Sequence, residues 1–214
     1  MTDISAPAFE LDHITVSATS LEDALRYTED CLGIKIPAGG EHPKMGTHNH
    51  LLSLGSDLFL EVIAVNPAAE KLSHPRWFGL DAIGNRSPKL ATWILRTHDI
   101  RASLAHGPAG GGKPMTLTRG DLSWLMSVPT DGSMPMDGAY PTLIEWPDIP
   151  HPASKMQDLG CRLESMTLFH PEVETILKYL KGPFIDPRVQ FEKASTFSMK
   201  ATIITPNGRK RLGG

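Results

Sequence analysis

Apolar and polar residues alternate along the first extended segment of the chain, Leu11–Ser17. In a strand with this pattern, Ile14 and Val16 face one side and His13 faces the other. Asp12 directly precedes His13, so it is expected on the side opposite His13 rather than in a pair with it. The segment is therefore predicted to be a half-buried strand with a histidine near its centre.

A strand followed by an amphipathic helix occurs three times along the chain. In the first copy the helix is expected to end before Gly33, and Thr19 with Glu22 has the spacing of a capping box. Similar patterns follow at 90–107 and 163–180, offset from the first copy by 79 and 152 residues. Internal similarity of this kind indicates that the fold is built from repeated units.

Strand-like segments follow each strand–helix pair, so the repeating unit is βαβββ. We expect a first module over residues 9–66, a linker over 67–88, a second module over 89–147 and a shorter third βαββ unit over 160–206. The expected fold class is α+β, with all units in one compact domain. The basic run 209–211 near the C-terminus is expected to be a frayed, solvated tail.

A hairpin in the first module carries candidate chemistry. Gly55-Ser56 is typical of a tight two-residue turn, and this turn would place His50 directly opposite Glu61 on one face of the sheet. Glu61 interrupts an otherwise apolar strand. It is either a surface charge on a solvated face or a carboxylate placed for binding or catalysis.

The second module contains a matching glutamate. Glu145 lies among apolar residues in Thr142–Trp146, the last strand of its module, and we expect it at the place that Glu61 has in the first module. His13 lies in the first strand of its module, where the second module has Thr92. Imidazole nitrogens and carboxylate oxygens are ligands that divalent metals accept.

Tandem βαβββ units with these residues resemble the vicinal-oxygen-chelate superfamily, which includes glyoxalase I, extradiol dioxygenases and methylmalonyl-CoA epimerase, and within it the bacterial glyoxalase-like domain proteins. The segments that carry the resemblance are Leu11–Val16, His42–Gly55, Leu58–Val65, Pro75–Asp81 and Pro141–Trp146. The resemblance implies curved mixed sheets around a U-shaped cleft, with the metal of metal-binding members on the concave face.

The resemblance also implies a set of ligands. His13, Glu61 and Glu145 match metal-ligand positions, and the ion would be a divalent metal such as Zn, Ni, Mn, Fe or Co. Thr92 occupies the remaining ligand position and is a poor ligand, so His50 is the candidate to replace it. A cleft without any metal is the alternative.

Two functions are compatible with this cleft. One is a metal-assisted isomerase, epimerase or lyase acting on a small oxygen-bearing metabolite, in which Glu145, or else Glu61, transfers the proton. The other is a metal-free protein that binds or sequesters a drug or metabolite. In both cases Asn49, Thr92 and Trp146 are expected to line the substrate cleft.

Charge and cysteine content limit the partners. The formal net charge is −3, so no overall basic field would attract nucleic acid or an anionic membrane surface. The 2 cysteines exclude a disulfide framework. The N-terminal residues lack the pattern of a signal peptide, and the longest apolar stretch, 58–65, is too short to span a bilayer. We expect a cytoplasmic monomer or homodimer whose partner is a small molecule.

Overall fold

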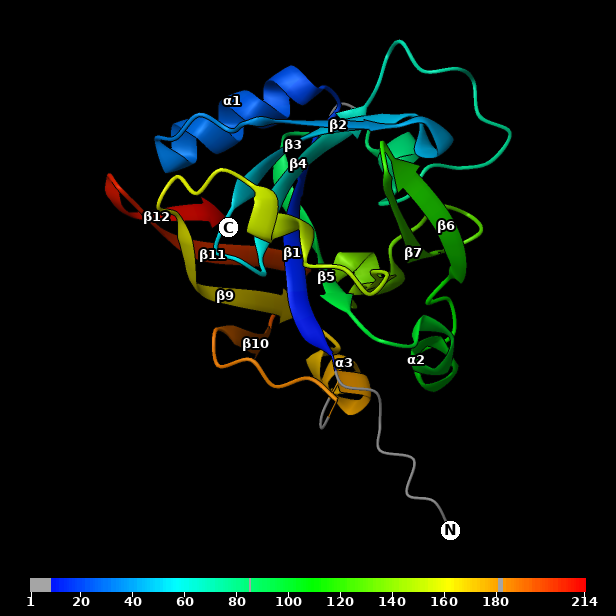
Figure 1. The fold of residues 1–214 in the computed structure, drawn as a ribbon. Helices are drawn as coiled ribbons and strands as arrows, with labels where there is room; N and C mark the ends of the chain where they lie inside the picture. Colours follow the sequence, from blue (N-terminus) through cyan, green and yellow to red (C-terminus); the bar gives the residue numbers. More distant parts are fainter. Residues whose placement is uncertain (1–8, 85, 181–182) are drawn as a thin grey trace.

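The first repeat forms one half of an eight-stranded sheet (Figure 1). The computed structural model describes residues 9–84, 86–180 and 183–214. Within the first repeat the elements are β1 (Glu10–Ser17), α1 (Leu21–Leu32), β2 (Ala38–His42), β3 (Thr47–Ser53) and β4 (Phe59–Val65). Their order in the sheet is β2-β3-β4-β1, with β1 parallel to β4.

Local hydrogen bonds set the ends of α1. Ser20, not the expected Thr19, is the N-cap, because its hydroxyl accepts a hydrogen bond from the Asp23 backbone N–H at 3.1 Å. The Thr19 hydroxyl instead donates to the Gly84 carbonyl at 2.6 Å. Gly33 ends the helix as predicted, with a left-handed φ of 67° that few other residues adopt.

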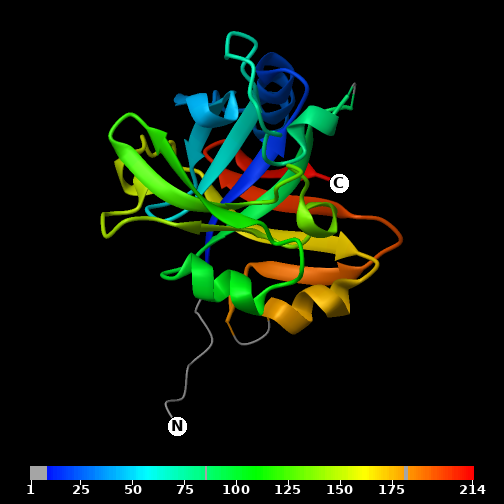
Figure 2. The same cartoon turned by 90° about the vertical axis from the view of Figure 1, so that its right-hand side faces the viewer.

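The second repeat completes the sheet. It comprises β5 (Lys89–Arg96), α2 (Ile100–His106), β6 (Lys113–Arg119), β7 (Leu122–Val128) and β8 (Thr142–Glu145), in the order β5-β8-β7-β6. β1 and β5 pair antiparallel and join the two halves. The edge strands β2 and β6 also contact each other, so the sheet curls until it nearly closes, as the turned view in Figure 2 shows. The α+β class with curved mixed sheets is confirmed.

The third unit forms a separate four-stranded sheet. Its elements are β9 (Arg162–His170), α3 (Val173–Leu180), β10 (Val189–Lys193), β11 (Ser198–Thr205) and β12 (Gly208–Gly213), in the order β10-β9-β11-β12. β10 lies directly beside β9 and parallel to it. In the first two modules the parallel neighbour of the first strand is the last strand, so the third unit repeats their sequence pattern with a different sheet order.

The expectation of a solvated C-terminal tail is wrong. Residues 208–213 form β12, which pairs antiparallel with β11. The reason is Leu212, which is 1% exposed and packs into the core. The three basic side chains that precede it, 209–211, are exposed or partly exposed, which is why the sequence of this strand resembles a charged tail.

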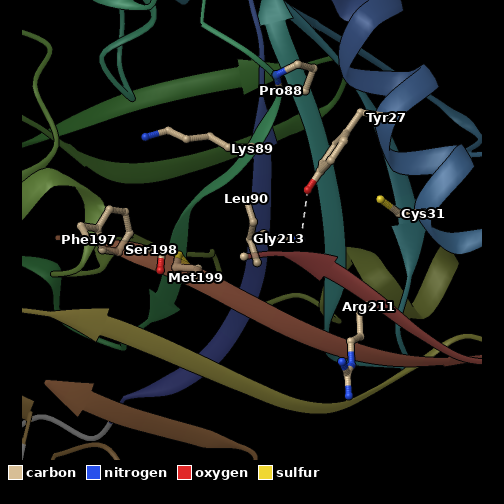
Figure 3. Close-up of a pocket in the computed structure, with 11 residues that line it drawn as sticks. Tyr27, Cys31, Pro88, Lys89, Leu90, Phe197, Ser198, Met199, Arg211 and Gly213 are labelled. Carbon is tan, nitrogen blue, oxygen red and sulfur yellow. Dashed lines mark hydrogen bonds between the residues drawn. The ribbon is translucent and has the colours of Figure 1, made fainter. Parts of the chain in front are cut away.

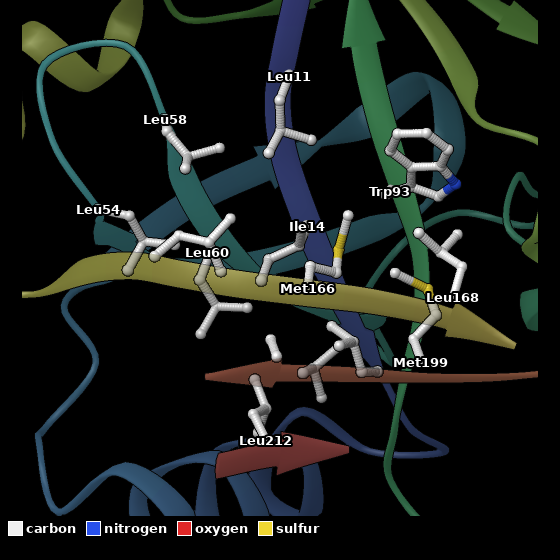
Figure 4. Close-up of a cluster of buried hydrophobic side chains, with 14 of the residues drawn as sticks. Leu11, Ile14, Leu54, Leu58, Leu60, Trp93, Met166, Leu168, Met199 and Leu212 are labelled. Carbon is white, nitrogen blue, oxygen red and sulfur yellow. The ribbon is translucent and has the colours of Figure 1, made fainter. Parts of the chain in front are cut away.

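The two faces of the eight-stranded sheet bury different clusters. The outer face packs against the four-stranded sheet, and Figure 4 shows members of this outer cluster from β1, β4, β5, β9, β11 and β12. Ile14 and Trp93 of the first sheet and Met166 of the second are among them, each fully buried. The inner face, inside the curl, carries a second cluster that includes Ile63 and Trp124.

Short 3-10 helices lie in the connections between strands, at Pro43–Met45, Leu80–Ala82, Pro135–Gly138 and Pro152–Lys155. In the described ranges, every helix falls short of the length and apolar character that crossing a membrane requires.

Candidate functional site

The β3–β4 hairpin has a register one residue away from the predicted one. Leu51, not His50, pairs with Glu61. The cause is the length of the turn: the Leu54 N–H donates to the Leu58 carbonyl at 2.9 Å, which closes a three-residue loop instead of a two-residue one. Because strand side chains alternate, a shift of one residue moves His50 to the other face of the sheet from Glu61.

The hydrogen bonds of His50 and Asn49 agree with this shift. His50 Nδ1 lies 2.7 Å from the Ile36 carbonyl, away from the candidate site. Asn49 takes the place beside Glu61, and its Nδ2 donates to Glu61 Oε1 at 2.6 Å. The predicted cleft residue Asn49 is therefore in the site, whereas the predicted ligand His50 is not.

A β-bulge brings Asp12 and His13 to the same side of β1. The ladder with β5 skips Asp12, because Leu11 and His13 pair with consecutive residues of β5. Leu11 and Ile14 both pack in the outer cluster, so the two residues between them extend away from it. The expectation that Asp12 and His13 point to opposite faces is wrong, since strict alternation fails at a bulge.

Asp12 and His13 form a buried hydrogen-bonded pair. His13 Nδ1 donates to Asp12 Oδ1 at 2.6 Å, and the other Asp12 oxygen accepts from Trp146 Nε1 at 2.8 Å and from His151 Nε2 at 2.9 Å. Asp12 is fully buried, and burial alone would raise its pKa. The bonds from His13 and His151 outweigh this effect and hold the pKa of Asp12 well below its usual 3.8.

Glu61 lies on the other side of the His13 ring. Its Oε2 is 3.7 Å from His13 Nε2 and accepts from the Thr15 hydroxyl at 3.3 Å. The Asn49 amide holds the second carboxylate oxygen. Because Nδ1 of His13 is bound to an ionised carboxylate, Nε2 is the nitrogen left to exchange a proton, and it faces Glu61. The arrangement is an aspartate-oriented histidine beside a carboxylate.

Aromatic side chains enclose this pair. Phe59 stacks on His13 with ring centroids 4.3 Å apart, and Trp77, Trp124 and Trp146 line the same cavity. The free volume of this cavity is about 20 Å³, which holds about one water molecule. A ligand larger than a water molecule therefore fits beside His13 only after side chains of the cavity wall move.

Glu145 does not join His13 and Glu61. Its Oε2 accepts a hydrogen bond from the Ile100 backbone N–H at 2.7 Å, at the N-terminus of α2. The expected convergence of the three residues is wrong, because Glu145 was matched to the wrong strand position. The β5–β8 ladder pairs Thr142 with Ile94, while β1–β4 pairs Glu61 with Thr15. With the repeat offset of 79 residues, Thr142 is the counterpart of Glu61.

Of the other two residues predicted to line the cleft, Trp146 is in the cavity wall and Thr92 is not. Trp146 lines the cavity and holds Asp12. Thr92 is fully buried and pairs with Thr15 across the β1–β5 ladder, and its hydroxyl donates to the Gly138 carbonyl at 3.4 Å. Thr92 is not part of the cavity wall.

The donor set does not fit a divalent metal. Only His13 and Glu61 of the four proposed ligands share the cavity. His42 is a further imidazole in its wall, and the second module supplies no metal ligand there, only Arg119, Trp124, Met126, Ile144 and Trp146. Across the described ranges, no three His, Cys, Asp or Glu side chains are grouped to hold an ion. Metal sites in proteins usually have at least three such ligands.

Two further cavity residues were missed in the sequence. His42 is 3% exposed, and burial lowers its pKa to about 4, so it is neutral at pH 7. Arg119, at the end of β6, packs over Gly40 of β2; a Cβ on this glycine would lie 2.8 Å from Arg119 Cδ. Burial lowers the pKa of Arg119, and the charge of Glu61 acts in the opposite direction. An arginine is still protonated at neutral pH.

One signal in the sequence could have revealed the acid–base pair. Leu11 and Ile14 are both apolar and three positions apart, which breaks the alternation expected of a regular strand. A bulge at Asp12 restores it. Nothing comparable marks His151 or Arg119, which come from a loop and a strand end far along the chain.

A larger surface pocket, of about 460 Å³, lies between α1, β5 and the β11–β12 hairpin (Figure 3). It contains Tyr27, whose hydroxyl accepts from the Gly213 N–H at 3.0 Å, and Cys31. None of the predicted site residues lines it. The inner cavity, although smaller, is where the titratable groups converge.

Comparisons with known proteins agree on the fold. The sequence model of the family described as "Glyoxalase-like domain" matches residues 11–183. A hypothetical protein from Staphylococcus aureus has a similar structure, with 16% identity, a TM-score of 0.56 and coverage of 96% of this chain and 84% of that one. At this identity the similarity concerns the fold alone. None of the curated proteins matches the chain.

Methylmalonyl-CoA epimerases give weaker structural matches. The enzyme from Mycobacterium tuberculosis is 17% identical with a TM-score of 0.44, over 70% of this chain and 94% of that one. A Streptomyces coelicolor epimerase variant in complex with 2-nitronate-propionyl-CoA is 14% identical with a TM-score of 0.45, over 67% and 98%.

Proposed function

The chain belongs to the glyoxalase-like domain family, and we propose that it binds a small oxygen-bearing metabolite in the inner cavity and moves a proton on it without a metal. The observation that carries the proposal is the Asp12–His13 hydrogen bond of 2.6 Å, with His13 Nε2 directed to Glu61 at 3.7 Å. A buried carboxylate that orients a histidine is the arrangement that makes imidazole an effective general base.

The proton transfer follows from this geometry. His13 Nε2 removes a proton from a substrate carbon next to a carbonyl group. The electron pair of the C–H bond moves onto the carbonyl oxygen, which gives an enediolate or enolate. Asp12 stabilises the imidazolium that forms, because its negative charge lies 2.6 Å from Nδ1.

Glu61 completes the transfer. Its Oε2 is close enough to His13 Nε2 to pass the proton on after a small movement, and the bonds from Asn49 and Thr15 fix its orientation. Returning the proton to a neighbouring atom gives isomerisation, and returning it to the other face of the same carbon gives epimerisation. Both are reactions without net oxidation or hydrolysis.

Binding without turnover is the second candidate, and the aromatic wall favours it. Trp124 and Trp146 lie with ring centroids 5.3 Å apart, and Trp77 stacks on Phe78 at 5.0 Å. Such a wall can hold a planar or apolar ligand by burial alone. In that case His13 and Asp12 would only anchor the ligand.

Deuterium exchange tests the proposal. The protein is treated with a chelator and incubated in D₂O with 2-hydroxyketones, 2-hydroxyaldehydes, 2-oxo acids and 2-methyl thioesters, and proton NMR follows the C–H signal next to the carbonyl. We expect exchange of at least one class, equal with and without added metal, and a loss of about 10²–10⁴-fold in His13→Gln.

His106→Gln is the matched control, because His106 is an exposed histidine on α2. It should exchange at the wild-type rate. Exchange that appears only after Zn²⁺, Ni²⁺ or Mn²⁺ is added would reject the metal-free proposal. Ligand binding with no exchange in any class would leave the binding function as the better account.

A further inference from the structure

We propose that the inner cavity opens at the seam between β2 and β6, and that Arg119 binds a carboxylate group of the ligand there. The ligand class is then a small carboxylate with a carbonyl or hydroxyl group on the neighbouring carbon. This inference rests on the proposed function for the identity of the cavity, and it adds the anionic group by which the ligand is recognised.

Arg119 lies between two spaces. It lines the narrow inner cavity, and it also lines an outer pocket of about 290 Å³ at the protein surface. Leu51 is the other residue that lines both spaces. A change in the side-chain conformation of these two residues would connect the outer pocket with His13 and Glu61, so they are the gate to the cavity.

The charge of the outer pocket favours an anion. Arg119 and Lys155 are its two charged residues, and none of its lining residues in the described ranges is acidic. The pocket on the other side of Trp146 has an acidic excess, because Glu10, Glu145 and Asp148 line it with Arg96, which pairs with Glu10. Charges of one sign around an opening attract ligands of the other sign.

Arg119 has its hydrogen-bonding capacity available. Neither a hydrogen bond nor an ion pair to its guanidinium is formed by the residues that the structure describes, although the side chain is partly buried. A buried or half-buried arginine normally has an acidic or carbonyl partner. A carboxylate matches the two parallel N–H donors of a guanidinium, which makes it the fitting ligand group.

Two indole N–H groups of the cavity wall are also without partners. Trp77 and Trp124 are 3% and 5% exposed, both line the cavity with Arg119, and the Nε1 of each lacks a hydrogen-bond acceptor among the described residues. An unpaired buried donor is costly, so a ligand oxygen that accepts from it adds affinity. An oxygen-rich anion would satisfy all three groups.

The opposite wall holds the acid–base groups. Glu61 is the charged group that acts on Arg119 through the cavity. A carboxylate bound at Arg119 therefore places the rest of the ligand, with the carbon that carries the exchangeable proton, toward His13 and Glu61. The same carboxylate would be repelled by Glu61 in the reverse orientation, so the arrangement selects one direction of binding.

Isothermal titration calorimetry tests the subsite. The probes are sodium lactate, pyruvate and mandelate, each compared with its neutral amide. We expect at least one carboxylate to bind at least 10-fold more tightly than its amide. Arg119→Gln should weaken that carboxylate 10- to 100-fold and leave the amide unchanged, while Arg119→Lys should recover part of the affinity. Trp124→Phe, which removes one N–H, should weaken it about 3- to 10-fold.

Arg101→Gln is the charge-matched control, since Arg101 is an exposed arginine on α2, and thermal denaturation checks that each variant is folded. Equal affinity for carboxylates and amides, or for wild type and Arg119→Gln, overturns the subsite, and so does the absence of binding by all three carboxylates. Deuterium exchange by the wild type, His13→Gln and Arg119→Gln separates the two proposals. Carboxylate-selective binding that is lost in Arg119→Gln, with no exchange in the wild type or either variant, keeps the subsite and rejects proton transfer. Exchange that is lost in His13→Gln but unchanged in Arg119→Gln keeps proton transfer and rejects the subsite.

Discussion

Asp12 is a buried carboxylate whose side-chain hydrogen bonds come from three ring nitrogens, on His13, Trp146 and His151. This network explains both its ionisation and its position. A carboxylate without such donors would be protonated at this depth, and a protonated Asp12 would neither orient His13 nor stabilise its charged form. The chemistry proposed for the cavity thus depends on one residue of a strand bulge.

His42 gives the protein a measurable pH dependence. Its pKa is about 4 in the folded state because of burial, against 6.5 in an exposed histidine. Between these values the unfolded chain binds a proton that the folded chain does not, so stability is full above pH 6.5 and falls as the pH decreases toward 4. The expected loss of unfolding free energy is about 2–3 kcal/mol.

Urea denaturation at a series of pH values measures this loss. His42→Gln keeps a group that can bond to Thr47, the partner of His42 Nδ1 at 3.1 Å, but does not titrate. The pH dependence over this range should therefore be shallower by that amount in the variant. An equal slope in both proteins would mean that His42 titrates normally.

Among the elements, α2 and β8 explain the role of Glu145. Its carboxylate lies at the N-terminus of the helix, where it accepts from the Ile100 N–H and interacts favourably with the helix dipole. Glu145→Gln should therefore leave proton transfer and ligand affinity unchanged and lower the unfolding free energy by about 0.3–1 kcal/mol. Deuterium exchange and chemical denaturation of the same preparation measure both effects. A large loss of exchange would return Glu145 to the mechanism.

Alternation and turn residues predict most of the strands and helices correctly. β1 begins one residue before the predicted segment Leu11–Ser17 and ends with it, and β8 lacks only the last residue of Thr142–Trp146. β2, 38–42, was missed because its sequence, AGGEH, has almost no apolar residue to show a period. Its two central glycines make room for Asn49 and Arg119 instead.

The site was harder to predict because it depends on single-residue shifts. The loop between Leu54 and Leu58 has three residues rather than two, so Asn49 and not His50 lies beside Glu61. The bulge at Asp12 likewise creates a pair that regular alternation forbids. Sequence periodicity averages over such shifts, whereas the chemistry of a site depends on each of them.

For the whole molecule, the third unit acts as the cover of the outer face. Its four strands bury the apolar side of the curved sheet, so the inner face is left for the cavity. The repeats therefore have different roles: two form the site, and the third stabilises the sheet that carries it.

Substituting Met166 of β9 tests how much the third unit contributes to the free energy of unfolding. It is fully buried between the two sheets. Met166→Ala should lower the unfolding free energy by about 2–5 kcal/mol because it removes buried methylene groups and leaves a cavity. Ligand affinity at the inner cavity should not change. Met156, a partly buried methionine outside this cluster, is the control: Met156→Ala should cost clearly less. Equal losses would contradict the assigned role of the third unit.

The measurement that tests the account most directly is the deuterium-exchange rate of Asp12→Asn at saturating ligand, in chelator-treated protein. The substitution keeps the shape of Asp12 but removes the charge that orients His13 and stabilises the imidazolium. We predict an exchange rate about 10²–10⁴-fold below that of the wild type, with ligand affinity within a few-fold and a folded protein by circular dichroism. An exchange rate equal to the wild-type rate would show that the buried Asp12–His13 pair takes no part in proton transfer.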